Sequence, residues 1–89
     1  MVIELDGQMM TDRAQTHAYL KNTFRFPEYY GNNLDALYDL LTEFSEPSRI
    51  VLKNKDIMLK HLGAYGTALL VTLHQAEENT SAISIEVYD

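Results

Sequence analysis

An acidic stretch in the middle of the chain has the side chains best suited to chemistry. Residues 26–48 contain no lysine or arginine, and their acidic residues are Glu28, Asp35, Asp39, Glu43 and Glu46. The four-residue spacing puts Asp35, Asp39 and Glu43 in one row on a helix, with successive Cβ atoms about 5–6 Å apart. Each such like-charge pair destabilises the helix by roughly a few tenths of a kcal/mol. A row of this kind is suited to receive arginine or lysine from a partner, as phosphate oxygens do.

Tyrosines accompany this acidic row at Tyr29, Tyr30 and Tyr38. A rigid apolar ring with a polar tip is the residue type enriched at the anchors of protein interfaces. A structural interpretation stands beside this functional one. Asp35 lies in the first turn of the predicted helix, where the helix dipole stabilises any carboxylate, and Tyr30 has the character of a core residue. Charge and periodicity alone therefore support a protein-binding face and a merely solvated face equally.

No other set of residues has the spacing of a catalytic or metal site. His17, His61 and His74 are scattered, cysteine is absent, and there is no Gly-rich phosphate loop or nucleophile motif. Asp35 and Asp39 could form an acid/base pair, but a glycosidase needs its carboxyls across a substrate cleft rather than adjacent on one convex helix. His17 lies on the apolar side of a predicted helix, where a packed histidine with both ring nitrogens hydrogen-bonded is expected. We therefore expect a protein that is not an enzyme and has no metal or cofactor.

Length, composition and charge limit the class of protein. With 89 residues, of which 46% are hydrophobic and 22% charged, residues 1–89 are expected to form a single domain with a modest core. The net charge of −6 disfavours nucleic acid, because binding a polyanion depends on lysine and arginine, and it favours a basic protein partner. The first residues are acidic where a signal peptide is basic, and the apolar runs are too short to cross a membrane. We therefore expect a cytoplasmic protein.

Hydrophobic periodicity and helix-breaking residues predict three strands and four helices. The predicted strands cover residues 2–6, 50–52 and 83–87. The first predicted helix runs from a cap at Thr11 or Asp12 to Phe24, and the second from Asn32 or Asn33 to Phe44. The third is capped by Asp56 and ended by Gly63, and the fourth covers 66–79.

The order of these elements predicts the architecture. Strands separated by helices pair in parallel, and right-handed crossovers on one face give the order 1-2-3. The predicted fold is therefore α/β and two-layer, with a three-stranded parallel sheet covered by about four helices. In the second helix Leu37 and Leu41 belong to an apolar stripe that is predicted to face the sheet. Covering only one face departs from the usual burial of parallel sheets on both faces.

The segment from Pro27 to Thr42, PEYYGNNLDALYDLLT, resembles the signature of the barstar family of intracellular ribonuclease inhibitors. The match is long and contiguous, and the rest of the chain is similar in length and element order. The resemblance implies a small α/β fold with a three-stranded parallel sheet. It also implies tight, one-to-one blockade of a basic, extracellular-type ribonuclease of the barnase type by a protein that is monomeric when free.

The resemblance also implies roles for individual residues. Asp39 matches the main acidic plug, which enters the phosphate-binding site of the enzyme, and Asp35 matches a second acidic contact. The other matching positions are an aromatic contact at Tyr29, polar contacts at Asn33 and Thr42, and two positions that are tryptophan in the best-known member, Tyr38 and Phe44.

Two positions depart from the family pattern. Glu43 stands where the best-known member has glycine, which adds charge and bulk inside the expected footprint. The acidic contact of the last helix falls on Gln75, so that charge is missing, and Glu77 and Glu78 are the candidates to replace it. An acidic interaction or immunity module directed at a different nuclease or basic protein is the alternative function. The basic stretch from Arg49 to Lys60 is interpreted as strand-edge protection and solvation rather than a second contact.

Overall fold

A three-stranded parallel sheet forms one layer of the molecule. The computed structural model describes residues 1–89, with strands β1 (Val2–Asp6), β2 (Ser48–Lys53) and β3 (Ile83–Val87) in the order β1-β2-β3. The register places Ile50 of the central strand opposite Ile3 on one side and Ile85 on the other. The predicted parallel pairing and strand order are confirmed.

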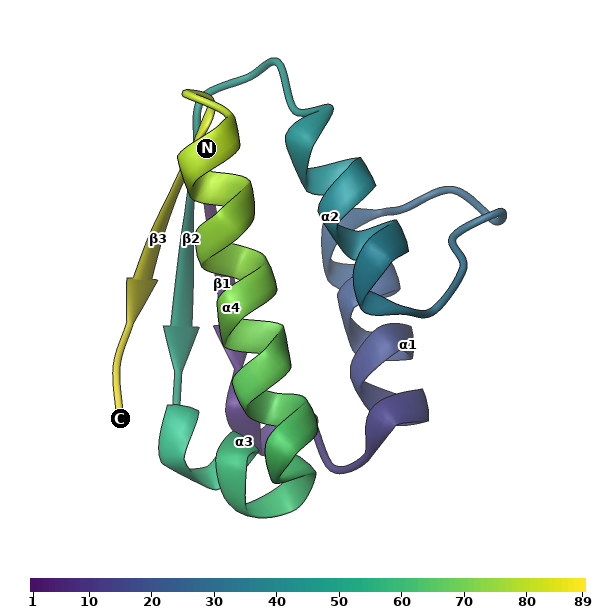
Figure 1. The fold of residues 1–89 in the computed structure, drawn as a ribbon, viewed down its shortest axis with the longest axis vertical. Helices are drawn as coiled ribbons and strands as arrows, with labels where there is room; N and C mark the ends of the chain where they lie inside the picture. The colour runs from purple at the N-terminus through teal and green to yellow at the C-terminus, as the bar shows by residue number, and fades with distance from the viewer.

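Four helices form the second layer, as predicted. They are α1 (Arg13–Phe24), α2 (Leu34–Thr42), α3 (Lys55–Leu62) and α4 (Ala64–Asn79), and the short 3-10 turn η1 (Gly7–Met9) follows β1. Figure 1 shows α4 lying in front of the sheet, with α2 and α1 beside it. Fully buried core residues come from both layers, among them Leu5, Leu20, Leu37, Ile50, Leu52 and Leu69. No helix of the chain has the length and apolar character needed to span a lipid bilayer.

The second face of the sheet has no covering layer, and its side chains explain how it remains stable in water. Arg49 Nε lies 2.8 Å from a carboxylate oxygen of Glu86, and Lys53 Nζ lies 3.0 Å from one of Glu4. These ion pairs run between neighbouring strands, and Val51 on the central strand is only 7% exposed. A sheet face whose exposed side chains are charged and paired does not require a second layer of helices.

Helix α2 packs against α4, and its apolar stripe points inward as predicted. Leu37 and Leu41 are fully buried in the core cluster that also contains Ile50 and Leu52 of the central strand. The consequence is a surface shared by α2 and α4, which holds the candidate site.

Most element boundaries follow the local signals of the sequence. Asp12 caps α1 by accepting a hydrogen bond of 2.8 Å from the Gln15 N–H, and Asn33 caps α2. Helix α2 ends at Thr42, two residues before the predicted end at Phe44. Its last turn tightens, since the Phe44 N–H donates to the Leu41 carbonyl, three residues back. Helix α4 begins at Ala64, earlier than predicted.

The prediction that Asp56 caps α3 is wrong. The N-cap residue is Asn54, which has left-handed backbone (φ 58°) and makes no capping side-chain hydrogen bond. Its side chain instead donates to Asp6 Oδ1 at 2.9 Å, and the next residue, Lys55, donates its N–H to the Tyr88 carbonyl at 3.0 Å. These two tertiary hydrogen bonds start the helix directly after β2, so Asp56 falls in its first turn.

Candidate functional site

The acidic row on α2 is presented to solvent by the way the helix is anchored. Asn33 Oδ1 accepts a hydrogen bond of 2.7 Å from the Ala36 N–H and starts the helix. Because Leu37 is fully buried, the opposite face points outward, and Asp35, Asp39 and Glu43 are all exposed.

None of these three carboxylates has an ion pair within the chain, whereas most of the basic residues do. Arg49 and Lys53 pair across the sheet, and Lys55 Nζ lies 2.7 Å from Asp89 and 3.7 Å from Asp56. The Lys55 ammonium lowers the pKa of the Asp89 carboxyl, by a hydrogen bond first and by charge second. The basic stretch is thus largely paired internally, and none of its cations forms an ion pair with the acidic row of α2.

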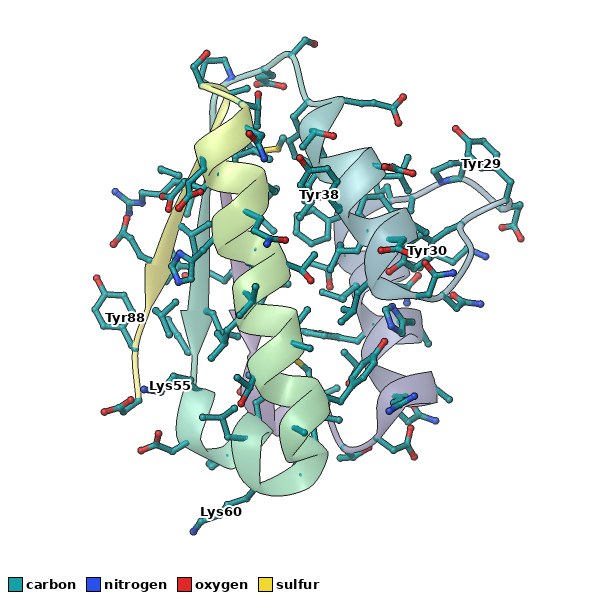
Figure 2. All side chains as sticks on the ribbon, in the orientation of Figure 1. Tyr29, Tyr30, Tyr38, Lys55, Lys60 and Tyr88 are labelled. Atoms are coloured by element: carbon teal, nitrogen blue, oxygen red, sulfur yellow. The ribbon has the colours of Figure 1, made fainter.

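Two lysines of the basic stretch lie away from the tyrosines of the candidate site. Figure 2 shows Lys55 and Lys60 at the end of the fold near α3, whereas Tyr29 and Tyr38 lie toward the opposite end, around α2. The basic residues nearest the acidic row are Arg13 and Lys21 of α1, which line a groove together with Asp35.

A groove between α2 and α4 adjoins the acidic row. Tyr38 is half-buried there, and its hydroxyl accepts a hydrogen bond of 2.8 Å from Asn79 Nδ2. Figure 2 shows the Tyr38 ring lying between the two helices. The groove is lined by Leu34, Asp35, Tyr38, Thr72, Gln75, Glu78 and Asn79. The structure thus brings Asp35, Tyr38 and Gln75 together, although Gln75 is far from the other two in sequence.

The two glutamates that could replace the missing acid on α4 lie in different environments. Glu77 is half-buried, and its Oε2 accepts a hydrogen bond of 2.7 Å from the Ile85 N–H of β3. Glu78 is exposed and lines the groove with Asp35. The Glu77 side chain therefore links α4 to β3, whereas Glu78 adds its charge to the acidic surface.

The remaining predicted contacts of the loop and helix differ in how free their side chains are. Tyr29 is 78% exposed, and Figure 2 shows it projecting from the loop before α2. Asn33 already uses its side chain twice, since Nδ2 also donates to the Gly31 carbonyl at 3.2 Å. The Thr42 hydroxyl donates to the Tyr38 and Asp39 carbonyls at 3.0 and 3.1 Å, so its oxygen is the part free to accept from a partner.

Phe44 is not brought into the α2–α4 groove. It is half-buried and packs edge-on against Phe24 of α1, with ring centroids 6.0 Å apart, beside the start of β1. Tyr30 is likewise a core residue, with 4% of its side chain exposed, in agreement with the structural interpretation.

Sequence reasoning missed Thr72 and Asn79 as lining residues of the groove. With Gln75 they occur at i, i+3 and i+7 on α4, which places them on one helix face. That periodicity is visible in the sequence, but only the packing of α2 against α4 shows which surface this face joins. No group of three or more histidine, cysteine, aspartate or glutamate side chains is placed to hold a metal ion.

The fold and the site together define a small acidic α/β protein that presents a row of exposed carboxylates without internal ion pairs beside a groove that contains Tyr38. Residues 1–88 match the family model described as Barstar (barnase inhibitor). The chain is also 39% identical over 77 residues to "Putative ribonuclease inhibitor YrdF" of Bacillus subtilis (strain 168), and the alignment covers 85% of each chain. The chain therefore belongs to the barstar family.

Proposed function

We propose that this protein inhibits a basic ribonuclease of the barnase type in a one-to-one complex. The acidic face of α2 enters the phosphate-binding pocket of the enzyme, with Asp39 as the central plug and Asp35 as the second acidic contact. The observation that supports this most strongly is the exposure of Asp35, Asp39 and Glu43 without any internal ion pair. Membership of the barstar family supports a ribonuclease as the partner.

The groove and the loop supply the rest of the proposed contact surface. Tyr29 from the loop and Tyr38 from the groove provide aromatic area, and Glu78 provides the acidic contact on α4 that Gln75 lacks. Asn33 and Thr42 line the ends of α2 and contribute polar atoms. Glu43 extends the acidic row by one turn, and Phe44 supports the helix from the core side.

Titration of the protein into a purified barnase-type ribonuclease tests this function directly. RNA cleavage is expected to fall linearly and to vanish at an equimolar ratio. Unchanged cleavage in a large molar excess of the protein would contradict the proposal, and binding without loss of cleavage would place the contact away from the enzyme's active site.

The association rate is expected to fall as salt rises. The net charge is −6, and the acidic surface is exposed, so a basic enzyme is attracted over a distance set by the Debye length. Between about 10 mM and about 1 M salt this length shrinks from about 30 to about 3 Å, and we expect the association rate to drop about tenfold or more. Stopped-flow fluorescence measures it, and a salt-independent rate would contradict electrostatic capture.

Glu78→Gln is expected to weaken binding about two- to fivefold, mainly through slower association, since an exposed charge pair contributes up to about 1 kcal/mol. Glu77→Gln is the matched control, because it makes the same chemical change at the adjacent residue with the same net charge. Glu77 accepts from the Ile85 N–H, so its variant is expected to lose some stability and to keep its affinity. Surface plasmon resonance and thermal unfolding separate the two effects, and equal losses of affinity would show that net charge rather than position matters.

A further inference from the structure

A buried histidine joins three separate segments of the fold. His17 of α1 is 1% exposed, and both of its ring nitrogens lie 2.6 Å from a tyrosine hydroxyl. Nδ1 is paired with Tyr30, in the loop before α2, and Nε2 is paired with Tyr65, in the first turn of α4. We call this arrangement the Tyr30–His17–Tyr65 bridge. It agrees with the expectation of a packed histidine whose ring is fully hydrogen-bonded.

The chemistry of the bridge makes its three members interdependent. A neutral imidazole has one N–H donor and one acceptor nitrogen, so one tyrosine hydroxyl accepts and the other donates. Burial lowers the pKa of His17, which keeps the ring neutral, and burial raises the pKa of Tyr30. The charged groups nearby are Arg13, whose guanidinium carbon lies 4.2 Å from the centre of the Tyr65 ring, and Lys21 and Asp35. All three line a second groove, distinct from the one between α2 and α4, together with His17 and Tyr65.

The segment that the bridge holds is the one leading into the acidic helix. The loop begins and ends at residues with left-handed backbone, the α1 C-cap Arg25 (φ 57°) and Asn32 (φ 54°), so its path turns sharply at both ends. Between these residues, Phe26 and Tyr30 both turn inward, and their ring centroids lie 4.9 Å apart. Its neighbour Tyr29 consequently points outward.

We propose that Tyr65 is a positioning residue that acts through His17 to hold Tyr30 in place. By holding Tyr30, it fixes the loop from Tyr29 to Asn33 and the start of α2 in the conformation that binds the ribonuclease. This inference rests on the proposed function. A loop that is ordered before binding does not lose that freedom in the complex, so preorganisation strengthens affinity without any added contact.

The decisive variant is Tyr65→Phe, which keeps the ring and removes only the hydroxyl. In the free protein, amide hydrogen exchange at Tyr30, whose N–H donates to the Pro27 carbonyl at 3.0 Å, is expected to accelerate about two- to tenfold, as for the loss of one hydrogen bond. Exchange at Ser48, whose N–H donates to Ala82 in the sheet, is expected to stay unchanged. In complex with a barnase-type ribonuclease, the dissociation rate is expected to rise by a similar factor at an unchanged association rate, since no charge has changed.

Tyr19→Phe is the matched control. It removes the same chemical group from α1, where the Tyr19 hydroxyl accepts a hydrogen bond of 2.8 Å from the Asp6 N–H at the end of β1. This variant is expected to leave both the exchange at Tyr30 and the dissociation rate as they are in the unaltered protein.

Three outcomes would overturn the inference. The first is unchanged amide exchange at Tyr30 in Tyr65→Phe. The second is equally faster exchange at Tyr30 and Ser48, which indicates global destabilisation. The third is faster exchange at Tyr30 with an unchanged dissociation rate of the complex. If the unaltered protein binds no barnase-type ribonuclease, the proposed function fails and the binding half of the inference fails with it. The exchange comparison in the free protein then still decides whether the bridge holds the loop.

Discussion

Asp39→Ala is expected to weaken inhibition of the ribonuclease roughly a hundredfold or more while leaving the free protein at least as stable. In the proposed complex Asp39 is the carboxylate that meets the cationic pocket of the enzyme, and removing one partner of a buried ion pair costs about 3–5 kcal/mol. In the free protein Asp39 is exposed, has no ion pair, and lies between Asp35 and Glu43 at like-charge spacing. Alanine also has the higher helix propensity.

Inhibition is expected to weaken while the stability of the free protein is expected to stay the same or rise, so the two measurements together test the assignment. Inhibition constants from RNA cleavage and free energies of unfolding from urea titration are measured on the same preparation. Asp56→Ala is the matched control, because it removes one exposed carboxylate from the first turn of α3, near the end of the fold where Figure 2 shows Lys55. Equal loss of inhibition in both variants would show that net charge matters and position does not. A large loss of stability in Asp39→Ala would contradict the assignment of the residue to binding.

Leu37→Ala is expected to show the opposite behaviour on the same helix. Leu37 is fully buried and belongs to the main core cluster, so truncation removes apolar contacts and leaves a cavity. Such substitutions cost about 2–5 kcal/mol, a large share of the stability of a domain of this size. The acidic face is untouched, so the molecules that remain folded are expected to bind with nearly unchanged affinity.

Denaturant unfolding measures the first effect, and binding at a temperature well below the unfolding midpoint measures the second. Leu40→Ala is a graded comparison, because Leu40 lies on the same helix but is only partly buried, and it is expected to lose less stability. If Leu37→Ala lost its affinity while fully folded, the acidic row would depend on core packing more than the geometry of α2 implies.

Local signals account for the parts of the fold that were predicted well. Asp12 and Asn33 are strong N-caps because their side-chain oxygens reach backbone N–H groups only a few residues away. The alternation from Ile83 to Val87 marks a strand with one apolar face, and such a pattern needs no knowledge of distant residues. Asp56 shows the limit of this reasoning. Its sequence context suits a cap, but hydrogen bonds from Asn54 and Lys55 to distant residues start α3 earlier.

The sequence by itself determined that Asp35, Asp39 and Glu43 would form one row on the face opposite Leu37, because the helical period relates residues that are close in the chain. Only the tertiary structure decided that α2 lies against α4, that Glu78 rather than Glu77 faces the resulting groove, and that most of the basic stretch is paired with the chain's own acids. The reason is physical. Those contacts join residues tens of positions apart, and they follow from how whole elements pack around a shared core rather than from the conformational preferences of any one segment.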